Sequence, residues 1–260
     1  VNFTSIGNTA VVLNTPYSIM KTLGSKETLV DPKFYAKGEL DRIFNPVITS
    51  QPKGLPTKKN LVIVILESYG DENIHAGYTP FLDSLAQHSM IYTNAYTNGR
   101  QSIHGMSSVL AGIPSFKDAF TSSPFPKQKI ESIVSTLESE GYQTSFFHGA
   151  ANGSMGFLGF SNILGIDQYY GRTEFNDDSQ FDGFWGIWDE PFLQFMKGEL
   201  DKEKQPFFSS VFTVSSHEPY IIPEKYKKKF PEGDIPIHKC IEYTDYSLKR
   251  FFTEAKKSTW

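Results

Sequence analysis

Four side chains able to bind a metal, act as a nucleophile or move a proton stand after or within apolar or glycine-containing segments of the chain. Glu67 directly follows the wholly apolar run at residues 61–66. Ser102 stands in a glycine-containing loop, and His148 and His217 each follow a Phe-rich segment. Carboxylate and hydroxyl oxygens can hold a divalent cation, a hydroxyl can attack once its pKa is lowered, and an imidazole changes charge near neutral pH. These residues are therefore the first candidates for a site.

Glu67 has two interpretations. A carboxylate that follows six apolar residues is expensive to bury unless an opposite charge or a bound cation compensates for it, which favours a metal ligand. The alternative is an N-cap or a salt-bridged surface carboxylate in the loop at residues 68–71. Its position alone does not decide between the two.

Ser102 stands just before an amphipathic segment that is typical of a helix. There its hydroxyl would lie near free backbone N–H groups and the positive end of the helix dipole, which together favour an anion. The alternative is a plain serine N-cap. The surrounding string lacks the G-x-S-x-G pattern of serine hydrolases, and a serine needs a base or a metal to lower its pKa before it attacks. A metal shared with Glu67 would supply that activation. Arg100, two residues earlier, could bind an anionic group or simply face solvent.

The six histidines divide into two groups. Three fall in loops that are predicted to follow strands and are candidates for substrate contact: His104, His148 and His217. The other three are expected to face solvent or to lack a partner: His75, His88 and His238. His217 is the strongest candidate, because its loop is short and contains Pro219.

Strands alternate with helices from residue 60 onward. The pattern predicts strands at residues 61–66, 91–95, 143–147 and 207–214. It predicts helices at residues 79–88, 102–110, 130–141, 157–164, 190–202 and 240–257. Such alternation is typical of an α/β sandwich with a mostly parallel sheet, and in open sheets of this kind a ligand lies outside the carboxyl ends of the strands. We therefore expect the candidate residues to meet at one edge.

Composition excludes several classes of protein. The 260 residues carry a formal net charge of -4, from 25 basic and 29 acidic side chains, which argues against a general nucleic-acid binder. A single cysteine, Cys240, excludes an internal disulfide framework, and no apolar run approaches the roughly 20 residues of a membrane helix. A Pro/Gly/Lys-rich connector at residues 45–59 predicts a lead-in segment, 1–59, and a domain, 60–260. Two parts of the lead-in, 18–23 and 32–42, look helical.

Two long strings carry a family resemblance. Residues 60–70 (NLVIVILESYG) and 98–114 (NGRQSIHGMSSVLAGIP), with the segment 79–83, resemble the sulfatase-like branch of the alkaline phosphatase superfamily. Within that branch they are most similar to lipoteichoic acid synthases and related phosphoglycerol transferases. The strings FHG at 147–149 and SHEPY at 216–220 match further motifs of that group. The resemblance extends from about residue 60 to the C-terminus.

The resemblance implies roles for the candidate residues. Glu67 would be a metal ligand, and Ser102 would both bind the metal and attack phosphorus. His148 and His217 would line the substrate pocket. The resemblance also implies an alkaline-phosphatase-like three-layer α/β sandwich, a location outside the cytoplasm and a membrane anchor upstream of Val1. The cofactor would be a divalent metal, manganese or magnesium first and zinc as the alternative.

The chain departs from the family pattern in three places. The family completes its metal site with an Asp-His pair after a helix like the one predicted at 240–257, and no Asp-His dipeptide occurs here. We therefore expect this chain to be truncated within the domain, to bind metal weakly and to be inactive by itself. Ala150, Met155 and Phe157 stand about where the glycerol-phosphate binders of the synthases are an acidic residue, a Trp and an Arg, and Ser102 lacks the C/S-x-P-x-R context of formylglycine sulfatases.

Three functions are compatible with these patterns. The first is metal-dependent transfer of a phosphoryl-type group, phosphoglycerol or a similar one, through a covalent intermediate on Ser102, with an anionic phospholipid or glycan of the cell envelope as substrate. The second is a sulfatase-like or phosphodiesterase hydrolase on the same site. The third, of another class, is a non-catalytic domain that binds an anion or a glycan.

Overall fold

The computed structural model describes residues 33–36, 38–45, 47–49, 51, 54, 57–115, 118–123 and 130–260, together with 16 and 20. The chain forms two compact units, Val1–Gly54 and Leu55–Trp260. In the first unit the described helix is α3 (Leu40–Ile43), which falls partly within the helical stretch predicted at 32–42. Apart from Met20, the stretch predicted at 18–23 lies outside the described residues.

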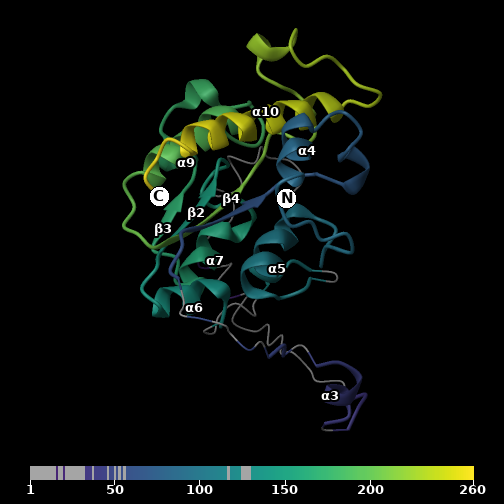
Figure 1. The fold of residues 1–260 in the computed structure, drawn as a ribbon, viewed down its shortest axis with the longest axis vertical. Helices are drawn as coiled ribbons and strands as arrows, with labels where there is room; N and C mark the ends of the chain where they lie inside the picture. Colours follow the sequence, from purple (N-terminus) through teal and green to yellow (C-terminus); the bar gives the residue numbers. More distant parts are fainter. Residues whose placement is uncertain are drawn as a thin grey trace. The chain divides into compact units, whose positions relative to one another are not determined.

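Four parallel strands form the described sheet of the second unit, in the order β1-β4-β2-β3 (Figure 1). They are β1 (Leu61–Ile65), β2 (Gln143–His148), β3 (Gln168–Tyr170) and β4 (Phe207–Phe212). β4 is central: it pairs with β1 on one side and with β2 on the other, and all its residues are buried. Because every pair is parallel, the carboxyl ends of the strands share one edge. The predicted parallel sheet is confirmed.

Helices cover both faces of the sheet. The described α-helices of this unit are α4 (Pro80–Ala86), α5 (Gly105–Ala111), α6 (Ile133–Ser139), α7 (Phe157–Leu164), α8 (Arg172–Phe175), α9 (Asp189–Leu200) and α10 (His238–Ala255). In Figure 1, α5, α6 and α7 lie on one side of the sheet and α9 and α10 on the other. Among the described residues, none of the helices combines the length and the apolar composition needed to cross a bilayer.

The alternation of side chains along β4 builds a separate core on each face. Phe208 and Phe212 pack with residues of α5, α6 and α7, whereas Phe207 and Val211 pack with residues of α9 and α10. The sheet is therefore the middle layer of a three-layer α/β sandwich, as predicted.

One predicted strand is wrong and one real strand was missed. Residues 91–95 form no strand and lie exposed, with Ile91 58% and Tyr92 77% accessible. Their residue types are typical of a strand, but the sequence pattern does not show whether a neighbouring strand is available to pair with them. β3 has only three residues, Gln168–Tyr170, too few for a recognisable alternation.

Candidate active site at the carboxyl edge of the sheet

The carboxyl ends of β1, β2 and β4 carry three of the first four candidates. Glu67 lies just beyond β1, His148 is the last residue of β2, and His217 lies in the loop after β4. Ser102 begins the 3-10 turn Ser102–His104 that leads into α5. One cavity of about 30 Å³ brings all four together, and its lining is Glu67, Ser102, His148, Ala150, Ser154, Met155, Trp185, Thr213, Val214 and His217.

A larger pocket of about 1080 Å³ shares Glu67, Ser102 and His217 with this cavity. Arg100, which is exposed, and His104, which is buried, line the larger pocket only. The six residues singled out from the sequence therefore lie around two connected spaces at one edge of the sheet.

Thr213 joins the ends of β1 and β4 and positions Glu67. Its hydroxyl accepts from the Glu67 amide N–H at 2.9 Å, and its own amide donates to the carbonyl of Ile65 at 3.1 Å. The Glu67 side chain is 6% exposed and its Oε1 accepts from the Ser68 hydroxyl at 2.8 Å. Ser68 has a φ of 56°, in the left-handed region, so the chain turns sharply after Glu67. Neither alternative from the sequence, an N-cap or a surface salt bridge, describes this buried carboxylate.

The Ser102 hydroxyl is not used to cap a helix. The N-cap residues of the 3-10 turn and of α5 are Gln101 and His104, and neither makes a side-chain cap hydrogen bond. Ser102 is half-buried and lines both spaces. Its hydroxyl is therefore available to a ligand in the cavity.

His104 is buried with both ring nitrogens unpartnered among the described residues. Gly99 packs directly against it, because a Cβ at Gly99 would lie 2.4 Å from the His104 Cβ and 2.5 Å from its Nδ1. This close approach, which only glycine permits, holds the loop that carries Arg100 against the turn that carries Ser102. An unpartnered buried imidazole is uncommon and suits contact with a ligand.

His148 is an acceptor at the cavity. Its Nδ1 lies 3.1 Å from the carbonyl oxygen of Phe212, and since a carbonyl can only accept, Nδ1 carries the hydrogen. Burial lowers the pKa of His148 to about 4, so the ring is neutral at pH 7. Its Nε2 is buried without a partner among the described residues, which leaves an unprotonated nitrogen beside the other cavity residues.

His217 is held by a backbone carbonyl and an indole ring. Its Nδ1 lies 2.9 Å from the Glu218 carbonyl oxygen, which also accepts from Trp185 Nε1 at 2.6 Å. The two rings lie against each other, with centroids 4.1 Å apart. Nδ1 of His217 therefore donates to the carbonyl, and Nε2 is the nitrogen left for a ligand.

Comparison with known proteins identifies the family. Residues 59–259 match a family model described as Sulfatase, which covers more than half of the chain. The chain belongs to the sulfatase family. This membership confirms the sulfatase-like resemblance predicted from the strings at residues 60–70 and 98–114.

Relatives of this sulfatase-family chain include synthases of lipoteichoic acid. A lipoteichoic acid synthase of Staphylococcus saprophyticus is 28% identical over 222 residues, which are 78% of this chain and 34% of the relative. The solved structure of an alkaline phosphatase superfamily protein from Vibrio parahaemolyticus matches with a TM-score of 0.72 and 31% identity, covering 79% of this chain and 52% of that one. A lipoteichoic acid synthase from Listeria monocytogenes matches with a TM-score of 0.66 and 26% identity, covering 76% and 52%. The predicted branch and the alkaline-phosphatase-like fold are confirmed, and the chain spans about a third of the curated relative and half of each solved chain.

The oxygen atoms of Glu67 and Ser102 fit a divalent cation. Among the described residues no ion pair includes Glu67, so its buried carboxylate has no cationic partner. A hydroxyl lines the same cavity, and hard cations prefer such oxygen ligands. Within the described ranges no group of three or more His, Cys, Asp or Glu is arranged to hold an ion. The sulfatase-family chain thus places a carboxylate and a hydroxyl around one cavity.

Asp189 anchors the loop that carries His217. Its carboxylate, 2% exposed, accepts from the amides of Val214 and Ser215 at 2.9 and 3.3 Å and from the Thr244 hydroxyl at 2.7 Å. Its own amide donates to the Ser215 hydroxyl at 2.9 Å. Burial raises the pKa of Asp189 to about 6, against the opposing effect of these hydrogen bonds. The first residue of α9 therefore holds the end of β4 in place.

Thr213, Asp189 and Trp185 were not predicted. Thr213 fell inside a predicted strand, and Asp189 stood one residue before a predicted helix, so each had an ordinary structural interpretation. Trp185 stands in an aromatic string, FDGFWGIW at residues 181–188, which was the available signal for a ring near the site.

The three residues at the positions expected for glycerol-phosphate binders do not all line the cavity. Ala150 and Met155 line the small cavity, as their positions indicated. Phe157 is fully buried and contacts the ring of His148 edge-on, with centroids 5.1 Å apart. The wall at this point is therefore apolar.

The other histidines lie away from the site. His75 and His88 are exposed, as expected, although His75 pairs with Asp83 at 2.9 Å. The expectation that His238 has no partner is wrong, because its ring stacks on Tyr78 with centroids 3.9 Å apart.

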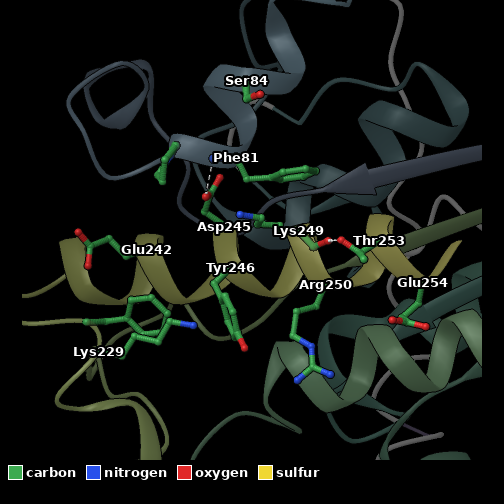
Figure 2. A pocket seen from close by; sticks show the side chains of 12 residues that line it. Phe81, Ser84, Lys229, Glu242, Asp245, Tyr246, Lys249, Arg250, Thr253 and Glu254 are labelled. Carbon is green, nitrogen blue, oxygen red and sulfur yellow. Dashed lines mark hydrogen bonds between the residues drawn. The ribbon is translucent and has the colours of Figure 1, made fainter. Parts of the chain in front are cut away.

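A second pocket, of about 580 Å³, lies over α10 and α4 (Figure 2). Figure 2 shows the Asp245 carboxylate reaching from α10 to α4, where it accepts from the amides of Phe81 and Leu82, each at 2.9 Å. Arg250 binds the buried Glu190 at 2.6 Å, and Lys229 Nζ lies 3.2 Å from the centre of the Tyr246 ring. The contacts of Asp245 and Arg250 join α10 to α4 and to α9. The lining of this pocket includes none of the predicted site residues.

Proposed function

We propose that this chain is a metal-dependent transferase that moves a phosphoryl-type group, phosphoglycerol or a similar one, through a covalent intermediate on Ser102. The observation that carries the proposal is the single cavity lined by Glu67, Ser102, His148 and His217. A carboxylate, a hydroxyl and two imidazoles around one small space match the roles of ligand, nucleophile and proton carrier. The lipoteichoic acid synthases among the relatives support the same class of chemistry.

Glu67 and Ser102 would hold the divalent cation. Manganese and magnesium prefer oxygen ligands and are the first candidates, with zinc as the alternative. When bound, the cation would lower the pKa of the serine hydroxyl and offset negative charge on the phosphoryl group. Burial without a cationic partner is the property of Glu67 that supports this role. Arg100 and His104, on the larger pocket, would bind the anionic remainder of the substrate.

Ser102 and His217 would act in both half-reactions, and His148 would orient the substrate. Ser102 would first lose its hydroxyl proton to solvent, its Oγ would then attack phosphorus, and the bond between phosphorus and the donor's oxygen would break as that oxygen takes a proton from Nε2 of His217. An acceptor alcohol then attacks the phosphoryl-serine, its proton passes to His217, and the Ser102 oxygen leaves. His148 is neutral and presents an acceptor nitrogen, so it would orient a hydroxyl group and donate no proton.

A hydrolase is the second candidate, because the matching family model is described as Sulfatase. Water would then take the place of the acceptor alcohol, giving a phosphodiesterase or a sulfatase on the same residues. Ser102 is followed by Ile103-His104-Gly105, which does not favour formylglycine chemistry. The substrate would be an anionic phospholipid or glycan, and the setting extracytoplasmic, on a membrane-anchored protein.

Ser102→Ala tests the proposal directly. We expect the full-length protein with Mn²⁺ to cleave bis(p-nitrophenyl) phosphate and to show a phosphoryl adduct on Ser102 by mass spectrometry, and the variant to lose both. Ser84→Ala, an exposed serine of α4, is the matched control and should leave turnover unchanged. Wild-type turnover in a folded Ser102→Ala protein would contradict the proposed nucleophile.

A further inference from the structure

Trp185 is fixed at the site by a rigid turn. Asp182 Oδ1 accepts from the amides of Phe184, Trp185 and Gly186 at 2.8, 2.8 and 3.1 Å. A Cβ at Gly186 would lie 2.7 Å from the Gly149 carbonyl oxygen, so only glycine allows the turn to pack this closely on the end of β2. The position of the indole is therefore set by backbone contacts and does not depend on a ligand.

The indole of Trp185 contacts the protein on one side and is partly exposed elsewhere. It lies against His217 and its Nε1 is bound to the Glu218 carbonyl, yet 42% of the residue remains exposed. Trp185 lines both the small cavity and the larger pocket. Ala150 and Met155, which stand about where the family pattern has an acidic residue and a Trp, line the cavity beside it. The indole and these two side chains give this wall a mainly apolar surface.

The larger pocket also carries side chains suited to hydroxyl groups. Asn98, Arg100 and Gln101 line it, together with Ser68. A pyranose ring has an apolar C–H face and hydroxyl groups at its rim, so it matches an aromatic wall accompanied by amide, guanidinium and hydroxyl groups. The pocket, about 1080 Å³, has room for a ring next to a phosphate.

We propose that Trp185 is a specificity-determining residue that packs against the sugar ring of a phosphorylated carbohydrate substrate. The inference rests on the proposed function, because it assumes that a phosphate group occupies the adjoining cavity. It goes further by naming the group attached to that phosphate. Glycerol, which has no flat apolar face, would gain little from the indole.

The test compares three soluble probes by titration calorimetry on the intact protein with Mn²⁺: inorganic phosphate, sn-glycerol 1-phosphate and α-D-glucose 1-phosphate. We expect the sugar phosphate to bind about tenfold more tightly than glycerol phosphate, the size of effect that aromatic packing supplies. Trp185→Ala should remove this advantage and leave glycerol phosphate within twofold, while Trp185→Phe should retain most of it. Phe184→Ala, a neighbouring exposed aromatic, is the matched control.

Two outcomes would overturn the inference while leaving the proposed function intact. One is equal affinity for the two phosphate esters in the wild type. The other is an equal loss for both esters in Trp185→Ala, which would show that the indole acts only by positioning His217. Failure of all three probes to bind would overturn the proposed function as well.

Discussion

Asp189→Asn removes the charge from a buried carboxyl group while keeping its shape. Burial raises the pKa of Asp189 from 3.8 to about 6. Because the folded state holds this proton more tightly than the unfolded state, the group's contribution to stability is fully present below pH 3.8 and is lost as the pH rises through about 6. The difference between the two pKa values corresponds to about 3 kcal/mol. Asparagine does not titrate, so the stability advantage of the wild type over the variant should shrink by about 2.4 kcal/mol from pH 4 to pH 7.

His148→Gln provides a matched control of opposite sign. Burial lowers the pKa of His148 from 6.5 to about 4, so its contribution to stability is present above pH 6.5 and is lost as the pH falls through about 4. The expected change is again about 3 kcal/mol, in the other direction. In the wild type the two groups largely cancel across this range, and the single variants should reveal each one.

Urea unfolding followed by tryptophan fluorescence at pH 4.0, 5.5 and 7.0, with a chelator present, measures both effects. The quantity to compare is the difference in free energy of unfolding between the wild type and each variant. Parallel pH profiles for the wild type and Asp189→Asn would refute the reasoning, as would an advantage of the wild type that grows with pH. Either result would mean that burial does not raise the pKa of this carboxyl group.

Further variants test other parts of the site and its support. Gly186→Ala places a methyl group 2.7 Å from the Gly149 carbonyl oxygen and should cost about 1–3 kcal/mol and reduce turnover; Gly153→Ala, where a Cβ would meet nothing within 4 Å, should be tolerated. Asp245→Ala removes the acceptor for two amides of α4 and should cost about 1–3 kcal/mol by urea unfolding, whereas Glu254→Ala, which breaks an exposed ion pair with Lys257, should leave the stability nearly unchanged. Thr213→Val keeps the shape but removes the acceptor of the Glu67 amide, so we expect weaker Mn²⁺ binding by calorimetry; unchanged affinity would separate Thr213 from the metal site.

The fold was predictable where local pattern and burial agree. The apolar run at 61–66 predicted β1 to within one residue, since a strand covered on both faces needs apolar residues at every position. The predicted helix at 157–164 has the bounds of α7. The helix predicted to end at Gly141 ends at Ser139, and Gly141, just beyond its C-cap, has a φ of 86°, which favours glycine. In each case the deciding interaction lies within a few residues.

The supporting residues were not predictable because their partners lie far away in the sequence. The Glu67 amide binds a hydroxyl 146 positions later, and the amide of Val214 binds a carboxylate 25 positions earlier. Hydrophobic period and turn signals contain no information about such pairs. Trp185 and His217 likewise meet only because β2 and β4 are neighbours in the sheet, an order that no local pattern reveals.

The strand wrongly predicted at 91–95 did not affect the predicted position of Ser102, because the contacts that hold Ser102 in place do not involve that segment. The turn that begins with Ser102 rests on the strand ends through Gly105, where a Cβ would lie 3.5 Å from the ring of Phe212 and 3.9 Å from Ile65. Ser102 is thus positioned by the start of α5 packing against β4 and β1, and a strand before the loop is not required. Strand-end reasoning located the serine because α5 docks at the same edge that the strands define.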